Sequence, residues 1–322
     1  MNTETFLSWR DVVIRVEGAP LSLIRTVTSG LDPIRVARFK ICEPWSVPAV
    51  IVIFKESDVV PRVDVEGGRT VVRGSVEYWS GAERFACVLL QAVDGHRLEN
   101  SRVILHGAAV AIGDSAVLLT GPSDAGKTTT ALQLCTSYGA RLISNDHILL
   151  EPDAGGFMAE PSDDTRLAFR SQALFLSRRD LYKAEYGDQG DVNVYKRSRV
   201  EPAVLGIRTC SERLPLRAIV TVGLGMVVGT EFYPTPRDRK TVALHADMTS
   251  RIRAADLILK TDADREEAPP ALPSLVTEAI WEGTRLAVAR LSTVPAWDAK
   301  GDPESISSAI VEAVNSVGGG PT

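Results

Sequence analysis

The sequence predicts an α/β fold with a mixed sheet, preceded by a small β-rich module. Three observations support this. A short apolar run, Ser115–Thr120, leads into the loop Gly121–Thr128, and an apolar-periodic helix follows at once. Before this run, two apolar segments are separated only by Gly113-Asp114, a spacing that predicts antiparallel strands. Residues 1–80 contain several short segments rich in β-branched residues, separated by turn signals.

The β-rich module is expected to span residues 1–80. Strands are expected where β-branched residues concentrate, at Val12–Val16, Ile34–Ile41 and Ala49–Phe54. The stretch Val63–Val76 alternates around Gly67-Gly68 as a hairpin does. This pattern carries no chemistry of its own, so a substrate surface and a structural cover for the larger domain, residues 81–322, are both open interpretations.

The larger domain alternates between helical and strand patterns. A helix is expected over Ala82–Val93, closed by Asp94-Gly95, and one strand over Val103–Ile112. Further strands are expected at Arg141–Asp146, His147–Glu151, Arg166–Arg170, Leu216–Gly223 and Arg290–Val294. Further helices are expected at Val242–Leu259, Leu275–Ala289 and Pro303–Val317. The polar segment Ser177–Pro202 is interpreted equally well as a lid or as a solvated excursion.

The loop Gly121–Thr128 matches G-x-x-x-x-G-K-[ST], and the flanking strand and helix are the setting in which this pattern binds phosphate. Gly121 and Gly126 let the backbone N–H groups face an anion, and the helix start adds its positive end. Lys127 is expected to reach the β- and γ-phosphates of ATP, and the Thr128 hydroxyl to ligate Mg²⁺. The expected binding loop comprises Gly121, Pro122, Ser123, Asp124, Ala125, Gly126, Lys127, Thr128 and Thr129.

Three further residues are candidates for the chemistry. His106 is expected on the strand that pairs with the one feeding the loop, and a core histidine is an equally open interpretation. Asp146 ends a strand, where it could ligate Mg²⁺ or accept the proton of an attacking hydroxyl. Asn145 beside it cannot be a base. Arg166 could neutralise charge on the transferring phosphoryl, although an exposed strand arginine without that task is commoner.

Composition limits the partners. The net charge of -5 does not fit a general nucleic-acid binder, whose footprint would be basic. No run approaches the roughly 18 apolar residues that span a bilayer, and no signal peptide is recognisable, so no membrane partner is expected. The cysteines lack metal-ligand spacing and are expected to be reduced, core or partly buried thiols of a cytoplasmic protein: Cys42, Cys87, Cys135 and Cys210.

The block His106–Asp146 resembles the HPr kinase/phosphorylase family. The resemblance is carried by His106-Gly107 ahead of the loop, by the loop Gly121–Thr128 itself, and by Asn145-Asp146 at the end of the next strand. The chain is most similar to HPr-kinase-related proteins of peptide natural-product pathways, including kinases of lasso-peptide precursors. The resemblance implies an open sheet of the HPr kinase/phosphoenolpyruvate carboxykinase type with antiparallel members, and ATP-dependent transfer to a Ser or Thr hydroxyl.

The resemblance also implies residue roles. His106 matches the family's active-site histidine, Lys127 and Thr128 its P-loop pair, and Asn145-Asp146 the position of its paired aspartates. The first of those aspartates is the acid/base in the family and is Asn145 here. Either Asp146 takes that role, or the base lies elsewhere, or transfer is lost. The C-terminal helices and signature loop of true HPr kinases are not recognisable, so HPr is not the expected substrate.

The expected function is an ATP-dependent kinase that phosphorylates a Ser or Thr hydroxyl of a peptide or protein, such as a natural-product precursor peptide. A small-molecule kinase and an ATP-binding regulatory protein without transfer activity are the alternatives. A homo-oligomer is left open.

Overall fold

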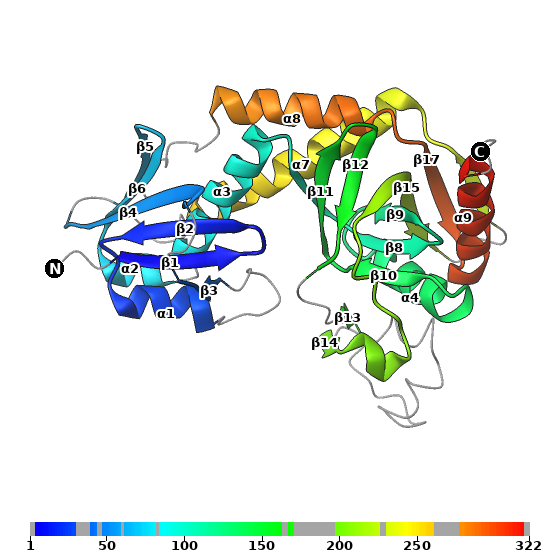
Figure 1. Ribbon diagram of the computed structural model, residues 1–322, viewed down its shortest axis with the longest axis horizontal. Helices are drawn as coiled ribbons and strands as arrows, with labels where there is room; N and C mark the ends of the chain where they lie inside the picture. The colour runs from blue at the N-terminus through cyan, green and yellow to red at the C-terminus, as the bar shows by residue number, and fades with distance from the viewer. Residues whose placement is uncertain are drawn as a thin grey trace. The chain divides into compact units, whose positions relative to one another are not determined.

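The structure is a computed structural model, and it describes residues 4–29, 39–43, 47–58, 61–81, 84–162, 167–170, 197–225, 230–260 and 277–318. The chain forms two compact units (Figure 1). The first comprises Met1–Ser101 and Met248–Arg285, and the second Arg102–Asp247 and Leu286–Thr322. The domain boundary expected at residue 80 lies inside the first unit.

The first unit is built on a six-stranded mixed sheet in the order β3-β1-β2-β4-β6-β5. Its strands are β1 (Glu4–Trp9), β2 (Val12–Glu17), β3 (Lys40–Ile41), β4 (Val50–Glu56), β5 (Arg62–Glu66) and β6 (Arg69–Gly74). The expected hairpin around Gly67-Gly68 is confirmed: β5 and β6 are antiparallel, and both glycines have positive φ, which this tight turn requires. Of the expected strand Ile34–Ile41, residues 34–38 lie outside the described residues.

Three helices of the first unit complete its core: α1 (Leu21–Ser29), α2 (Val76–Ser80) and α3 (Arg84–Glu99). The expectation of strands alone in residues 1–80 is therefore wrong. The expected helix end at Asp94-Gly95 is also wrong, because α3 continues to Glu99. A Cβ at Gly95 would lie 2.8 Å from Ile280 Cδ1, so this glycine allows a close helix contact and does not end the helix.

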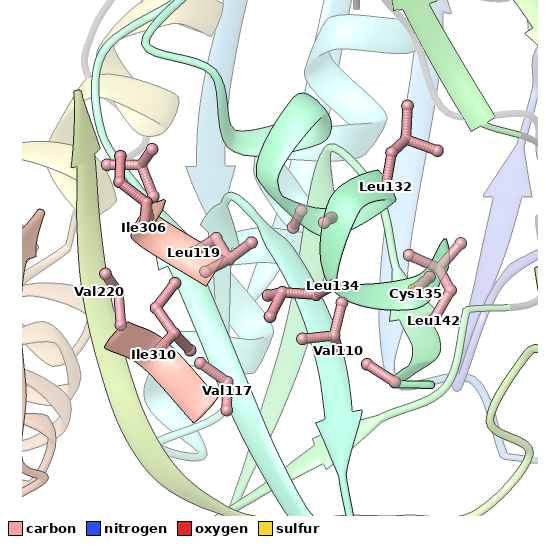
Figure 2. Close-up of a cluster of buried hydrophobic side chains, with 14 of the residues drawn as sticks. Val110, Val117, Leu119, Leu132, Leu134, Cys135, Leu142, Val220, Ile306 and Ile310 are labelled. Carbon is pink, nitrogen blue, oxygen red and sulfur yellow. The ribbon is translucent and has the colours of Figure 1, made fainter. Parts of the chain in front are cut away.

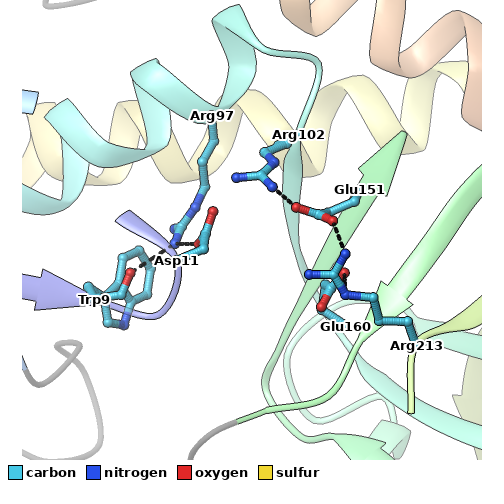
Figure 3. Close-up of polar contacts among 7 residues, drawn as sticks. All are labelled: Trp9, Asp11, Arg97, Arg102, Glu151, Glu160 and Arg213. Atoms are coloured by element: carbon cyan, nitrogen blue, oxygen red, sulfur yellow. Dashed lines mark hydrogen bonds and ion pairs between the residues drawn. The ribbon is translucent and has the colours of Figure 1, made fainter. Parts of the chain in front are cut away.

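A buried arginine ties α3 to the β1–β2 turn (Figure 3). The Arg97 side chain is 1% exposed, and its Nη2 donates to Asp11 Oδ1 at 2.6 Å and to the Trp9 carbonyl at 3.2 Å. Its guanidinium also lies 4.5 Å from the centroid of the Trp9 ring. Because a buried charge must be paired and hydrogen-bonded, these contacts fix the end of α3 against the sheet.

The second unit is built on a mixed sheet in the order β10-β8-β9-β15-β12-β11-β7, with β17 on β15 and β16 on β17. These strands are β7 (Val103–His106), β8 (Ala108–Ile112), β9 (Ser115–Thr120), β10 (Arg141–Ser144), β11 (His147–Asp153), β12 (Gly156–Glu160), β15 (Leu214–Leu224), β16 (Glu231–Pro234) and β17 (Ala296–Gly301). A separate pair consists of β13 (Leu167–Arg170) and β14 (Arg197–Val200). The expected mixed sheet and the antiparallel β8–β9 pair are confirmed, since β9 is also parallel to β15.

Helices and charged side chains hold this sheet in place. The helices within this unit are α4 (Lys127–Ser137), α9 (Pro303–Gly318) and the 3₁₀ helix η2 (Pro202–Leu205), while α7 (Arg237–Lys260) and α8 (Glu278–Leu291) each belong partly to this unit and partly to the first. Side chains of α4 and α9 join one core with those of β8, β9 and β15 (Figure 2). Glu151 of β11 pairs with Arg102 and Arg213, and Arg213 also reaches Glu160 of β12 (Figure 3).

Two strand expectations in this unit are wrong. Val103–Ile112 is not one strand, because the chain breaks at Gly107 into β7, which pairs with β11, and β8, which pairs with β9 and β10. A Cβ at Gly107 would lie 2.6 Å from the Leu119 carbonyl oxygen, so only glycine fits the break. Arg290–Val294 is not a strand either, because α8 continues to Leu291. Within the described residues, no helix is long and apolar enough to cross a membrane.

Candidate functional site

The loop between β9 and α4 is shaped by its glycines and held by β15. Gly121 and Gly126 have φ of 137° and 97°. A Cβ at Gly121 would lie 2.8 Å from the Val222 carbonyl oxygen, and one at Gly126 would lie 2.1 Å from Leu224 Cγ. The Leu224 N–H donates to the Ala125 carbonyl at 2.9 Å. The loop therefore lies directly against β15, in a conformation that needs glycine at both positions.

The first turn of α4 presents its N–H groups without a side-chain cap. Gly126 is the N-cap residue and its left-handed conformation turns the chain into the helix at Lys127. The Thr130 N–H makes the first intrahelical bond, to the Gly126 carbonyl at 2.9 Å. N–H groups of a first turn together with the helix dipole favour an anion, so this loop and helix start have the chemistry of a phosphate site.

Lys127 is buried at this helix start. Its side chain is 8% exposed, and Nζ donates to the carbonyls of Gly121 at 2.9 Å and Pro122 at 2.8 Å. Burial lowers the pKa of Lys127, and the carboxylates of Asp247, Asp146 and Asp124 oppose that shift. The lysine is thus held among loop carbonyls and acidic groups from three different elements.

The end of β10 lies beside Thr128. The Thr128 hydroxyl donates to Asn145 Oδ1 at 3.1 Å. Asp146 follows with φ of 69°, a left-handed conformation that Asp tolerates better than most residues, and its carbonyl accepts the Gly107 N–H at 3.1 Å. Thr128 and Asn145 are therefore in contact, and Asp146 is the next residue in the same turn; the expected roles of Thr128 and Asp146 at Mg²⁺ stay predictions.

These three side chains are suited to Mg²⁺. Mg²⁺ prefers oxygen ligands and is usually held by one or two carboxylates together with waters and substrate phosphates. A hydroxyl, an amide oxygen and a carboxylate meet that requirement. In the described part of the chain, this turn included, no three His, Cys, Asp or Glu side chains are grouped so that they could hold a metal ion, so a metal here would depend on the hydroxyl and amide oxygens as well.

His106 lies at the end of β7, where its position differs from the expected one. Its strand pairs with β11 and not with β9, and His106 lies opposite His147 in the register. The two imidazole rings are 5.9 Å apart between centroids, in an edge-to-face arrangement at 66°. The His106 N–H donates to Asp247 Oδ2 at 3.0 Å. His106 is therefore connected to the site through its backbone and α7.

Asp247 is a candidate site residue that no motif in the sequence marks. It lies on α7. The sequence predicts a helix there, but nothing in the helical pattern distinguishes this acid from the other polar residues of the helix. The structure brings it to Lys127 and to the His106 backbone. Arg166 lies outside the described residues, so its expected role stays a prediction.

Comparisons with known proteins give little. The chain matches no family model and no curated protein sequence. Among solved structures, the HPr(Ser) kinase/phosphatase from Coxiella burnetii is similar over 41% of this chain and 76% of that chain, with 14% sequence identity and a TM-score of 0.27. A likeness of this degree assigns neither fold nor activity.

Proposed function

We propose that this chain is an ATP-dependent kinase that transfers the γ-phosphoryl to a Ser or Thr hydroxyl of a peptide or protein. The supporting observation is the loop between β9 and α4, with glycines at two of its three positive-φ positions, Asp124 at the third, and the buried Lys127 at the helix start. Such a loop binds the phosphates of a nucleotide through backbone N–H groups and the lysine.

Each group of residues at the loop has its own role in the proposed reaction. The N–H groups of the loop and of the first turn of α4 bind the β- and γ-phosphates. Lys127 exchanges its two carbonyl partners for phosphate oxygens and stabilises the charge that develops on them. Thr128, Asn145 and Asp146 would hold Mg²⁺, which when bound neutralises phosphate charge. The acceptor hydroxyl attacks the γ-phosphorus in line, its proton passes to a carboxylate, and ADP leaves.

The acceptor class rests on the sequence resemblance to kinases of natural-product precursor peptides, carried by His106-Gly107, Gly121–Thr128 and Asn145-Asp146. A small metabolite remains the alternative acceptor. All four cysteines lie among the described residues and are free thiols. A cytoplasmic location belongs to the same proposal.

The decisive variant is Lys127→Ala. Incubated with ATP, Mg²⁺ and peptides encoded beside the gene, the wild-type chain is expected to add about 80 Da, the mass of one phosphoryl group, to a peptide, and the variant to be about 10²–10³-fold slower. Lys55→Ala is the matched control, because Lys55 is an exposed lysine of the β4 strand. A wild-type chain that fails to bind ATP, or a variant as fast as wild type, would contradict the proposal.

A nucleotide-binding protein without transfer activity is a second candidate. The Thr128 hydroxyl is bonded to the amide of Asn145 and not to a carboxylate, which favours binding over catalysis at this turn. The same assay separates the two candidates: tight ATP binding with neither ADP nor phosphopeptide formed at any acceptor concentration supports the second.

A further inference from the structure

The turn after β10 supplies a single carboxylate, that of Asp146, for two roles, which are to hold the metal and to accept a proton. Asp146 is the acid beside the proposed metal ligand Thr128, and Asn145 cannot accept a proton. A carboxylate that holds a metal is a poor base, because the cation stabilises its ionised form. A second carboxylate near the γ-phosphate would separate the base from the metal ligand.

Asp247 of α7 contacts the same short stretch of backbone, the end of β7, that the turn after β10 contacts. Its Oδ2 accepts the His106 N–H at 3.0 Å, and the next N–H along the chain, that of Gly107, donates to the Asp146 carbonyl at 3.1 Å. Two successive N–H groups at the β7–β8 break are thus taken by Asp247 and by Asp146. The Asp247 carboxylate and the β10 turn consequently flank one short stretch of backbone.

Asp247 is also near the phosphate-binding lysine. Of the three carboxylates that act on the charge of Lys127, that of Asp247 has the largest effect, ahead of Asp146 and Asp124. Lys127 is the side chain proposed to contact the β- and γ-phosphates, so the Asp247 carboxylate acts electrostatically on a group of the proposed phosphate site. The Asp247 side chain is half-buried, which leaves it accessible to an acceptor.

We propose that Asp247 is the base of this site and accepts the proton of the attacking hydroxyl, an inference that rests on the proposed kinase function. The acceptor oxygen forms a bond to the γ-phosphorus while its proton passes to the Asp247 carboxylate. The bond from the γ-phosphorus to the bridging oxygen breaks, and its electron pair leaves with ADP. Asp146 then serves only as a metal ligand.

The test uses water as the acceptor, so that no peptide need be known. The full-length chain is incubated with ATP and Mg²⁺, and ADP formation is followed. Asp247→Asn keeps an oxygen that can accept the His106 N–H but cannot take up a proton. We expect its kcat to fall about 10²–10³-fold, the range typical of a lost general base, with KM for ATP unchanged. Asp247→Glu should recover part of the loss.

Two further variants separate a base from a structural contact. Asp238→Asn removes the same charge from an exposed position on α7 and should hydrolyse ATP at the wild-type rate. Asp146→Asn should raise the Mg²⁺ concentration needed for half-maximal rate, which Asp247→Asn should not. Sodium formate, a small external base, should restore turnover to Asp247→Ala, whereas it cannot replace a lost packing contact.

The outcomes distinguish the inference from the function on which it rests. A wild-type chain that does not bind ATP, or that forms ADP with neither water nor the peptides encoded beside the gene as acceptor, overturns both. If the wild type hydrolyses ATP and Asp247→Asn is equally fast, the kinase function stands and the base assignment fails. It also fails if Asp247→Asn raises KM for ATP as much as it lowers kcat, or if formate rescues nothing.

Discussion

At the scale of single residues, Lys127 shows how the site keeps a buried ammonium group protonated. Burial disfavours its ammonium form, and two loop carbonyls together with three carboxylates favour it. Without the three carboxylates, burial would lower the pKa of Lys127 further, and a smaller fraction of the side chain would be protonated. Acidic groups around the proposed phosphate-binding lysine therefore have a physical role whether or not a nucleotide is bound.

Burial also decides how the four cysteine thiols react. Cys87, Cys135 and Cys210 are buried, and burial raises the pKa of Cys135 to about 12, whereas Cys42 is partly exposed. Because the thiolate is the reactive form, we expect Cys42 to react first with a thiol reagent at pH 8 in the folded chain. All four should react after denaturation. Mass spectrometry of the modified peptides identifies the site, and equal rates at Cys135 and Cys42 would contradict this.

At the scale of elements, α9 depends on a local cap. Asp302 Oδ1 accepts the N–H groups of Glu304 and Ser305, each at 3.0 Å, and Oδ2 accepts the Ser305 hydroxyl at 2.6 Å. The helix that begins there contributes Ile306 and Ile310 to the core with α4 (Figure 2). We expect Asp302→Ala to lower the free energy of unfolding by about 1 kcal/mol, measured by urea denaturation.

The same cap should depend on pH. The hydrogen bonds from Ser305 lower the pKa of the Asp302 carboxyl. A group whose folded pKa is lowered stabilises the fold above its unfolded pKa and loses that contribution as pH falls through the folded value. The difference between wild type and Asp302→Ala should therefore be full at neutral pH and shrink in acid. Asp302→Asn, a good cap without charge, is the control, and a difference that grows in acid would refute the assignment.

The elements that the sequence predicts well are those with local signals. The β5–β6 hairpin, the β8–β9 pair, α4 and α9 all have their turn or cap residues beside them in the chain. The elements predicted wrongly depend on distant contacts. Nothing local shows that Gly107 must pass the Leu119 carbonyl, or that Gly95 faces Ile280 and so lies within α3. The β-branched residues of α1 favour a strand, and packing into the core of the first unit overrides them.

At the scale of the whole molecule, the site is assembled from parts far apart in the chain. The loop, Thr128 and the β10 turn follow one another closely, and the motif predicts them together. Asp247 joins them from α7, a hundred residues later, through a backbone contact at His106. Side chains brought in by tertiary packing leave no spacing to detect, which is why the second carboxylate could not be predicted.

The two units have separate hydrophobic cores, and this determines what a bound nucleotide can stabilise. One core contains Val117 and Ile310, and the other contains Ile14 and Trp79. A ligand that binds only the folded form of one unit stabilises that unit by about 2.7 kcal/mol at a hundred times its Kd. We expect ATP with Mg²⁺ to slow amide hydrogen exchange in β9, α4 and β10, and to leave β1–β6 unchanged.

Peptide-resolved hydrogen exchange with mass spectrometry measures this directly. Lys127→Ala is the control, because it leaves both cores intact and removes a phosphate contact, so its protection at the same ATP concentration should be small. The N-terminal half of α7 should be protected with the loop, since Asp247 contacts the His106 backbone beside the β10 turn. Protection confined to β1–β6, or equal protection in Lys127→Ala, would mean that the nucleotide binds elsewhere and that the loop Gly121–Thr128 does not hold its phosphates.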